Sequence, residues 1–182
     1  MSQPLSESAT TPRDRRRVLQ ALIGLLLGMF VSMLASTVVS TSLPVIIHDL
    51  GGDQAAYTWV VTATLLTTAI STPIWGKLAD LFDRKMLIQI AITIFVLSTA
   101  AAGFSQDTTM LIACRAVQGI GAGGLAALSQ VIMADIISPR ERGRYMGLFG
   151  AVMALATIGG PLVGGVITDG IGWRWNFYVA LP

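Results

Sequence analysis

The residue of this sequence with the clearest capacity for chemistry is Arg115, a charged side chain within a long apolar segment. It lies about five residues, or roughly 7 Å along a helix, from the start of that segment near Met110. A charge at the centre of a membrane-spanning helix costs about 2.5–3.5 kcal/mol, so such charges usually serve a function. Gln118, one helical turn further on, is expected to hold the guanidinium group. Arg115 could then bind an anionic group or bias the ionisation of a carboxylate; the alternative is that its head only reaches the outer membrane interface.

No other group of side chains has the spacing of a catalytic or metal site. The sequence has no Ser/His/Asp set, and its single His48 and single Cys114 offer neither a metal cluster nor a disulfide. The glycine-rich segment from Gly119 to Gly124 is similar to a dinucleotide-binding loop, but it lies inside an apolar helix rather than after a strand. We therefore predict no enzyme activity, no cofactor and no metal.

Five segments are long and apolar enough to cross a membrane, for which a helix needs about 20 residues. The chain is 53% hydrophobic and 12% charged, whereas soluble domains are about 25% charged. A sixth apolar segment starts at Trp175 and stops at Pro182, so we expect a fragment of a longer protein. The sequence predicts an all-α polytopic membrane protein, with a disordered cytoplasmic tail over residues 1–17 and a helical bundle over residues 18–182. The predicted spans are residues 18–47, 56–78, 86–104, 110–137 and 145–167.

The basic residues predict how the chain lies in the membrane. Ten of the twelve Lys and Arg residues form three clusters, and the loops between the clusters contain none. This alternation is the positive-inside pattern of a polytopic membrane protein. It places the N-terminus in the cytoplasm and the protein in the cell membrane, and it favours anionic lipid over nucleic acid as the neighbour of the positive charge. The clusters are Arg13, Arg15, Arg16 and Arg17; Lys77, Arg84 and Lys85; and Arg140, Arg142 and Arg144.

Small residues recur every four positions in three of the predicted spans. This spacing puts each set on one helix face, where two helix backbones can approach closely. Tight helix packing is the interpretation we favour for most of them; the functional alternative is a smooth face along which helices can slide or rock. The sets are Gly24, Gly28, Ser32, Ser36 and Ser40; Gly119, Gly123 and Ala127; and Ala156, Gly160 and Gly164.

Four short patterns follow one another along the chain, each on the element where it is expected. Together they resemble the signatures of the major facilitator superfamily, in its drug:proton antiporter branch with fourteen spans. The resemblance covers nearly everything after residue 20. The patterns are GKLADLFDRK at residues 76–85, the fourth-span segment 111–119 with Arg115 and Gln118, GGPLVGG at residues 159–165, and WRWNF at residues 173–177.

The resemblance implies a proton-coupled exporter of small, amphipathic, drug-like molecules that works by alternating access together with a missing C-terminal half. Part of its central cavity, a gating loop on the cytoplasmic side and a kink in the fifth span would lie in this chain. In the gating loop, Asp80 is expected to pair with Arg84, and Asp135 could join them. The implied residues are Arg115, Gln118, Ser36, Ser40 and Thr41 in the proton and substrate cavity; Gly76, Asp80, Arg84 and Lys85 in the gating loop; and Gly159, Gly160, Pro161, Gly164 and Gly165 in the antiporter-type motif.

Two departures from the family pattern bear on this function. Many members of the branch carry an aspartate where Ala35 stands, so one candidate proton carrier is absent and cationic substrates are less favoured. Leu81 and Asp83 stand where the family often has arginine and glycine; because aspartate tolerates tight turns, we expect the turn to persist. The alternatives are an exporter of one metabolite or siderophore, an importer, and a non-transporting membrane fragment that assembles with a partner.

Overall fold

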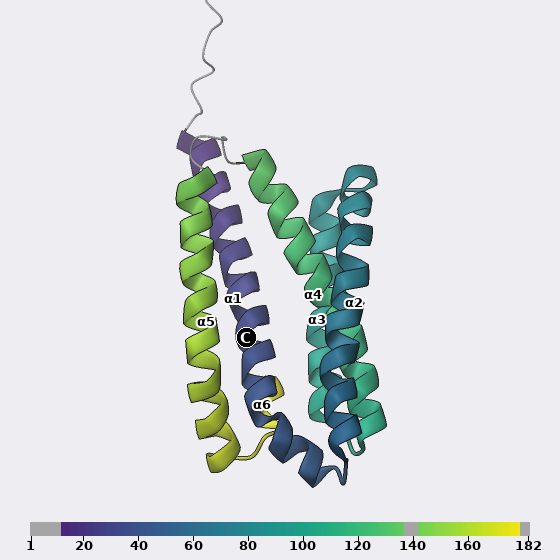
Figure 1. Ribbon diagram of the computed structural model, residues 1–182. Helices are drawn as coiled ribbons and strands as arrows, with labels where there is room; N and C mark the ends of the chain where they lie inside the picture. Colours follow the sequence, from purple (N-terminus) through teal and green to yellow (C-terminus); the bar gives the residue numbers. More distant parts are fainter. Residues whose placement is uncertain (1–11, 137–141, 179–182) are drawn as a thin grey trace, which may run out of the picture.

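The computed structural model describes residues 12–136 and 142–178, which form six helices joined by short turns (Figure 1). The all-α fold expected from the sequence is confirmed, and each predicted span corresponds to one helix. The helices are α1 (Pro12–Asp49), α2 (Gln54–Leu81), α3 (Arg84–Gly103), α4 (Thr108–Ile136), α5 (Arg142–Gly170) and the short α6 (Trp175–Tyr178).

Two boundaries differ from the prediction in ways that matter. Helix α1 begins at Pro12 rather than at residue 18, so residues 12–17, predicted to be disordered, are helical. Proline suits the first helical turn, and the arginines that follow are good helix formers. Helix α2 extends to Leu81 and α3 begins at Arg84. The connection between these helices, where the gating loop was predicted, therefore consists of only two residues. Residues 1–11 lie outside the described part of the chain.

Aspartates define where three of the helices begin. An Oδ1 atom of Asp53, Asp83 and Asp107 accepts the backbone N–H of the residue three positions later, at 2.8, 3.0 and 2.7 Å. A carboxylate at this place satisfies a free backbone donor and interacts favourably with the helix dipole. Asp83 has extended backbone angles and starts α3 as an N-cap, and the turn that was expected to persist here consists of Phe82 and Asp83.

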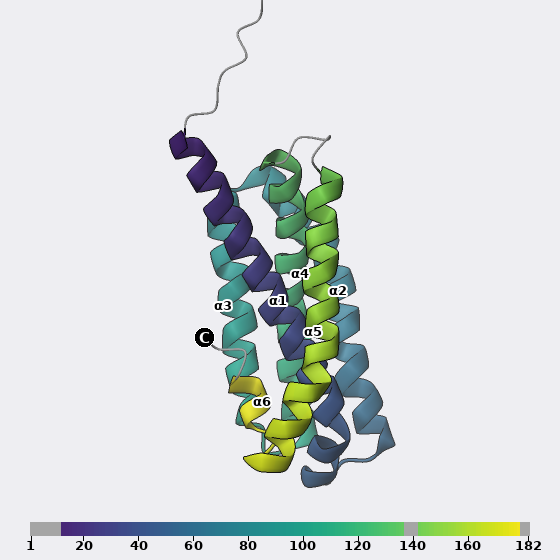
Figure 2. The same ribbon diagram turned by 90° about the vertical axis from the view of Figure 1, so that its left-hand side faces the viewer.

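The helices form two groups that α4 connects. Helices α1 and α5 run side by side, and α2 and α3 both pack along α4 (Figures 1 and 2). Helix α4 runs obliquely in Figure 1, and near its C-terminal end Met133 packs with Phe149 of α5. Near its N-terminal end Leu111 belongs to a core cluster with Leu43 of α1 and Phe177 of α6. Helix α4 therefore contributes core residues along most of its length.

Four of the helices in the described chain contain a stretch long and apolar enough to cross a membrane. Helix α2, predicted to be a fifth span, is not among them although it has 28 residues. Its Thr and Ser side chains lower its hydropathy, and many of them donate a hydrogen bond to a carbonyl oxygen of the preceding turn, such as Thr68 to Thr64 at 2.7 Å. The four stretches are Leu26–Asp49, Arg84–Gly103, Thr108–Asp135 and Met146–Gly170.

The two ends of the bundle carry different charges. We call the end where α1 and α5 begin, and where α2 turns into α3, the basic end (Figure 1). Lys77, Arg84 and Lys85 lie there together with Asp80, Asp83 and Asp135, and the arginines at the starts of α1 and α5 give this end its excess of basic residues. The opposite end carries four aspartates and one arginine, Arg174. These are Asp49, Asp53, Asp107 and Asp169.

The small residues of α4 and α5 lie where the helices come close, as their spacing predicted. A Cβ atom added to Gly123 would come within 2.9 Å of the Thr68 carbonyl oxygen of α2, and one added to Gly164 within 2.9 Å of the Val38 carbonyl oxygen of α1. These two pairs of helices could not approach so closely with larger residues at these positions. The prediction does not hold for Gly24 and Gly28 of α1, where an added Cβ meets no atom within 4 Å.

Candidate functional site

Arg115 and Gln118 form the expected hydrogen bond, and the structure extends it to a third residue on another helix. Arg115 is 3% exposed, and its Nη1 atom donates to Oε1 of Gln118 at 2.5 Å. The Nε2 atom of Gln118 donates to the hydroxyl oxygen of Thr99 on α3 at 2.7 Å. Thr99 in turn donates to the Phe95 carbonyl oxygen at 2.6 Å. The charged group is therefore held by a chain of hydrogen bonds across the α3–α4 interface.

These hydrogen bonds leave part of the Arg115 guanidinium group without a partner. The Nε atom of Arg115 is buried and makes no hydrogen bond within the described residues. No carboxylate of the described chain forms an ion pair with Arg115; the ion pair present involves Arg84 and Asp135. A buried cation normally has a counter-charge, because an unpaired charge is costly to remove from water. Arg115 therefore retains the capacity to bind a negatively charged group.

The predicted cavity residues do not all lie on one surface. Arg115 and Gln118 are buried against α3, whereas Ser40 and Thr41 of α1 are exposed and Ser36 is partly exposed. The Ser40 hydroxyl donates to the Ser36 carbonyl oxygen at 2.8 Å, and the Thr41 hydroxyl donates to that of Thr37 at 2.9 Å. With their protons used inside the helix, these hydroxyl oxygens remain free to accept hydrogen bonds from a ligand.

The predicted gating residues lie on two helices at the basic end. Asp80 is on α2, and Arg84 and Lys85 are in the first turn of α3. We had predicted that Arg84 pairs with Asp80 and that Asp135 could join them. In the structure Arg84 forms an ion pair with Asp135 near the end of α4, and the side chains of Arg84 and Asp135 are partly exposed. Gly76 lies inside α2, and a Cβ atom there would meet no atom within 4 Å. The ion pair therefore joins α3 to α4.

The antiporter-type motif lies in the half of α5 that packs on α1. Gly160 and Gly164 are buried, and a Cβ atom at Gly160 would collide with the Thr37 side chain. Thr37 also donates from its hydroxyl to the Ala156 carbonyl oxygen at 3.1 Å. Pro161 lies inside α5, which continues as a helix on both sides of it. Gly159 and Gly165 are partly exposed, so the buried contact involves only part of the motif.

A polar cluster at the opposite end was not predicted from the sequence. The buried Asn176 donates from its Nδ2 atom to the Ser42 hydroxyl at 2.6 Å and to the Thr168 hydroxyl at 2.8 Å. Nearby, the Trp173 indole N–H donates to Asp49 at 2.8 Å. The cluster joins α1, α5 and α6. Its members are ordinary residues near helix ends, so only the packing of the three helices identifies them as partners.

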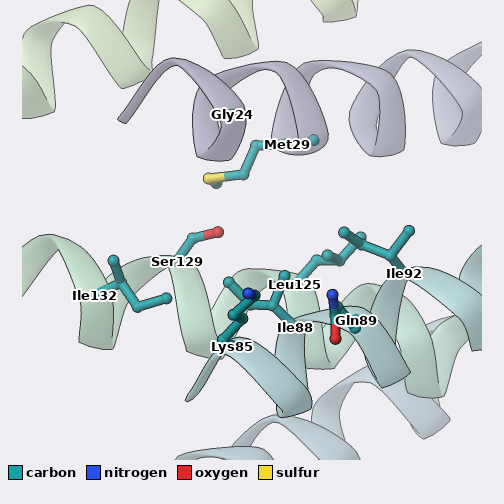
Figure 3. Close-up of a pocket in the computed structure, with 10 residues that line it drawn as sticks. Gly24, Met29, Lys85, Ile88, Gln89, Ile92, Leu125, Ser129 and Ile132 are labelled. Carbon is teal, nitrogen blue, oxygen red and sulfur yellow. The ribbon is translucent and has the colours of Figure 1, made fainter. Parts of the chain in front are cut away.

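An apolar groove lies between α1 and the α3–α4 pair in the half of the bundle nearer the basic end (Figure 3). Its volume is about 450 Å³. Gly24 and Gly28 lie on its α1 side, which explains why they contact no other helix. The other lining residues are Met29 of α1; Lys85, Ile88, Gln89 and Ile92 of α3; and Leu125, Ser129 and Ile132 of α4.

Most of the chain matches one protein family. Residues 25–182 match the sequence profile described as Major Facilitator Superfamily. The chain belongs to this superfamily. It is therefore part of a multi-pass membrane protein of a transporter family, as the order of its four motifs indicated.

Several curated relatives of the chain are named as efflux proteins. The efflux pump dotC of Dothistroma septosporum is 46% identical over 162 residues, which are 89% of this chain and 28% of that protein. The MFS-type efflux pump LUC4 of a Fusarium species is 37% identical over 179 residues, or 98% of this chain and 31% of that protein. The multidrug transporter protein MdtP of Bacillus subtilis is 40% identical over 142 residues, or 78% and 26%. The chain thus spans less than a third of the length of these relatives.

Solved transporter structures share the fold. A bacterial homologue of the human lysosomal transporter Spinster, in an inward-facing and unoccupied conformation, matches with a TM-score of 0.76 at 20% identity, over 96% of this chain and 41% of that one. The human organic anion transporter MFSD10 matches with a TM-score of 0.69 at 22% identity, over 93% and 46%. At these identities the likeness concerns the fold alone.

Proposed function

We propose that this chain is the N-terminal part of a proton-coupled exporter that moves small amphipathic molecules out of the cell by alternating access. The observation that carries the proposal is the buried Arg115, which has one side-chain partner and no carboxylate among the described residues. A protein that keeps an incompletely paired charge within a membrane span uses it in most cases. The names of the relatives, which are efflux pumps and a multidrug transporter, support export as the direction.

Arg115 would act on a negative charge supplied from outside this chain. A carboxylate in the remainder of the protein, or an anionic group of the substrate, would complete the pairing of its guanidinium group. If the partner is a carboxylate, its protonation weakens the attraction to Arg115 and its deprotonation restores it. Such a pair would link proton binding to a change in helix packing around α4.

The exposed hydroxyl groups of α1 would contribute to the substrate path. Ser40 and Thr41 offer acceptor oxygens to a substrate that carries hydrogen-bond donors, and the partly exposed Ser36 lies one turn away. Transporters of this type place the substrate near the middle of the membrane between two repeated bundles. The cavity would therefore be completed by the part of the protein that this chain lacks.

The orientation proposed for the chain has the basic end in the cytoplasm. Lys and Arg near the ends of membrane spans are enriched on the cytoplasmic side, and the basic end collects Lys77, Arg84 and Lys85 together with the starts of α1 and α5. The protein would lie in the cell membrane with its N-terminus inside. The Arg84–Asp135 ion pair would then be a cytoplasmic contact that can open and close during the cycle.

A second candidate is an exporter dedicated to one metabolite of the producing cell. A relative with 42% identity over 143 residues is named as the MFS-type transporter of the acurin A biosynthesis cluster of Aspergillus aculeatus. The absence of a carboxylate at Ala35 also favours a substrate that is not a cation.

The two candidates differ in the range of molecules that are exported. Cells that produce the complete transporter are loaded with a cationic, a neutral and an anionic fluorescent dye, and the loss of each dye is followed with and without a protonophore. Export of several dyes that stops when the protonophore is added supports the multidrug exporter. Export of none of them favours the dedicated exporter, and export that continues at full rate with the protonophore contradicts proton coupling.

A further inference from the structure

The hydroxyl group of Thr99 decides which way the amide of Gln118 faces. The Thr99 proton is used in the 2.6 Å hydrogen bond to the Phe95 carbonyl oxygen, so the hydroxyl oxygen can only accept from Gln118. The NH₂ group of Gln118 must therefore face Thr99, and its carbonyl oxygen faces Arg115. The reverse orientation would set the NH₂ group against a guanidinium that has only donors.

We propose that Thr99 is a positioning residue for Arg115, acting through Gln118. This inference rests on the proposed function, in which Arg115 takes part in proton-coupled export. Thr99 and Gln118 are 0% and 2% exposed, so water cannot replace either partner in this structure. Without the Thr99 oxygen, the Gln118 amide would lose its fixed orientation. Arg115 would then lose its hydrogen bond to Gln118, which is its side-chain partner.

The neighbouring Ser98 allows the proposed role of Thr99 to be compared with that of a buried hydroxyl group that has no bond to α4. Ser98 is 5% exposed and donates to the Ile94 carbonyl oxygen at 2.6 Å within its own helix. No hydrogen bond joins Ser98 to α4 in the described structure. Removing its hydroxyl therefore changes α3 locally but leaves the chain from Thr99 to Arg115 intact.

The variants follow from this difference. Thr99→Val keeps the shape of the side chain but removes the acceptor, and Thr99→Ser keeps the acceptor. Ser98→Ala is the matched control. We expect maximal export in Thr99→Val to fall about tenfold, the size expected for the loss of one buried hydrogen bond, with a smaller change in the substrate concentration for half-maximal rate. Thr99→Ser and Ser98→Ala should export within about twofold of the wild type, because each leaves the Thr99–Gln118–Arg115 chain in place.

A double-variant test asks whether Thr99 acts through Gln118. In the complete transporter, Gln118→Leu alone should reduce export about as much as Thr99→Val, and the double variant should be no worse than either single variant. Independent effects would multiply to roughly 100-fold. Dye export is measured per amount of protein in the membrane, so that lower abundance does not imitate lower activity.

A second measurement does not depend on transport. Phenylglyoxal modifies accessible arginines, and mass spectrometry of the purified complete transporter gives its rate at Arg115. The rate should rise roughly tenfold in Thr99→Val, because local opening loses a buried hydrogen bond, but not in Thr99→Ser or Ser98→Ala.

The outcomes separate this inference from the proposed function. Loss of coupling in Arg115→Ala together with wild-type export and wild-type modification in Thr99→Val would overturn the role of Thr99 and leave the proposed function standing. Full coupling in Arg115→Ala would overturn both. Equal loss in Thr99→Val and Ser98→Ala would show that Thr99 only stabilises α3.

Discussion

Arg115 is a charged side chain that lies within a membrane span without reaching water. A charge at the centre of such a helix costs about 2.5–3.5 kcal/mol, which is an upper figure for Arg115 because it lies nearer the start of α4 than its middle. A hydrogen bond to a charged group offsets about 1.5–3 kcal/mol. The bond to Gln118 therefore covers much of this cost but leaves the Nε atom without a partner. Arg115 is 3% exposed, so its guanidinium group is enclosed by other residues of the bundle rather than extended from its surface.

The shape of the Arg115 guanidinium should matter as well as its charge. We predict that Arg115→Lys recovers only part of the export lost in Arg115→Ala, because an ammonium cannot reproduce a planar group with five donors. The control is Arg174→Lys, an exposed arginine that lies 4.3 Å from the centre of the Trp173 ring. Export per amount of membrane protein is the measurement. Full recovery by lysine would mean that charge alone is needed.

The Arg84–Asp135 ion pair should influence the transport cycle more than the stability of the fold. Both side chains are partly exposed, and such pairs contribute about 0–1 kcal/mol. We predict that Arg84→Glu and Asp135→Lys each lower export at normal abundance, and that the double variant recovers part of it. Lys77→Glu, at the same end, is the control for charge. If the double variant is as poor as the single ones, the contact is not a gate.

At this scale the sequence predicted interactions within one helix better than those between helices. The spacing of three residues between Arg115 and Gln118 was enough to expect their hydrogen bond. The partner of Gln118 on α3 could not be predicted, because it depends on how α3 is rotated against α4. For the same reason Arg84 was paired with Asp80, which is close in sequence, and Asp135 was named only as a residue that could join them, whereas Asp135 is the partner in the structure.

The helices of this bundle pack through glycine faces opposite hydroxyl-bearing faces. Gly119 and Gly123 of α4 lie against the threonines of α2, and the Thr68 hydroxyl oxygen comes within 3.1 Å of the Gly119 carbonyl oxygen. Gly160 and Gly164 of α5 lie against Thr37 and Val38 of α1. Close backbone contact replaces the burial of large side chains at these interfaces, as is common in membranes.

A large residue at the α1–α5 contact should impair movement of the two helices. We predict that Gly160→Leu leaves the complete transporter in the membrane at normal abundance but abolishes export, because the side chain collides with Thr37. Gly150→Leu is the matched control on the same helix, since a Cβ atom at Gly150 meets nothing within 4 Å. Dye export and membrane abundance are measured in parallel. A parallel loss of abundance in Gly160→Leu would mean that the contact serves packing only.

The helix positions and two of the three small-residue faces could be predicted from the sequence. Whether another helix packs on each face could not. Apolar length placed α2, α3, α4 and α5 to within three residues at each end, whereas α1 begins six residues earlier than predicted. Four-residue spacing identified the contact faces of α4 and α5, but the same spacing at Gly24 and Gly28 leads to an open groove. Spacing shows that residues share a face; it does not show whether another helix covers that face.

The whole chain separates its charges toward two ends. In the described structure the basic end holds the arginines at the starts of α1 and α5 together with Lys77, Arg84 and Lys85, which outnumber the aspartates there, and four aspartates and Arg174 lie at the opposite end. Positive charge near span ends marks the cytoplasmic side. The proposed orientation of the bundle rests on this distribution of basic residues in the sequence and on the positions of the helix ends.

Cysteine labelling tests this orientation. In a Cys114→Ser background, we predict that single cysteines at Asp53 and Gln106 react with a membrane-impermeant thiol reagent in intact cells. Cysteines at Lys77 and Lys85 should react only after the cells are opened. All four positions are exposed in the structure, so a difference between them reports their side of the membrane. Labelling of Lys85→Cys from outside would reverse the proposed orientation.

The central claim is that export is coupled to protons and that Arg115 takes part in the coupling. It is tested most directly in everted membrane vesicles that contain the complete transporter and hold a proton gradient, with a dye that the wild type exports. Addition of the dye should release protons in the wild type and leave the gradient unchanged in Arg115→Ala at equal membrane abundance. Proton release by Arg115→Ala at the wild-type rate would contradict the account.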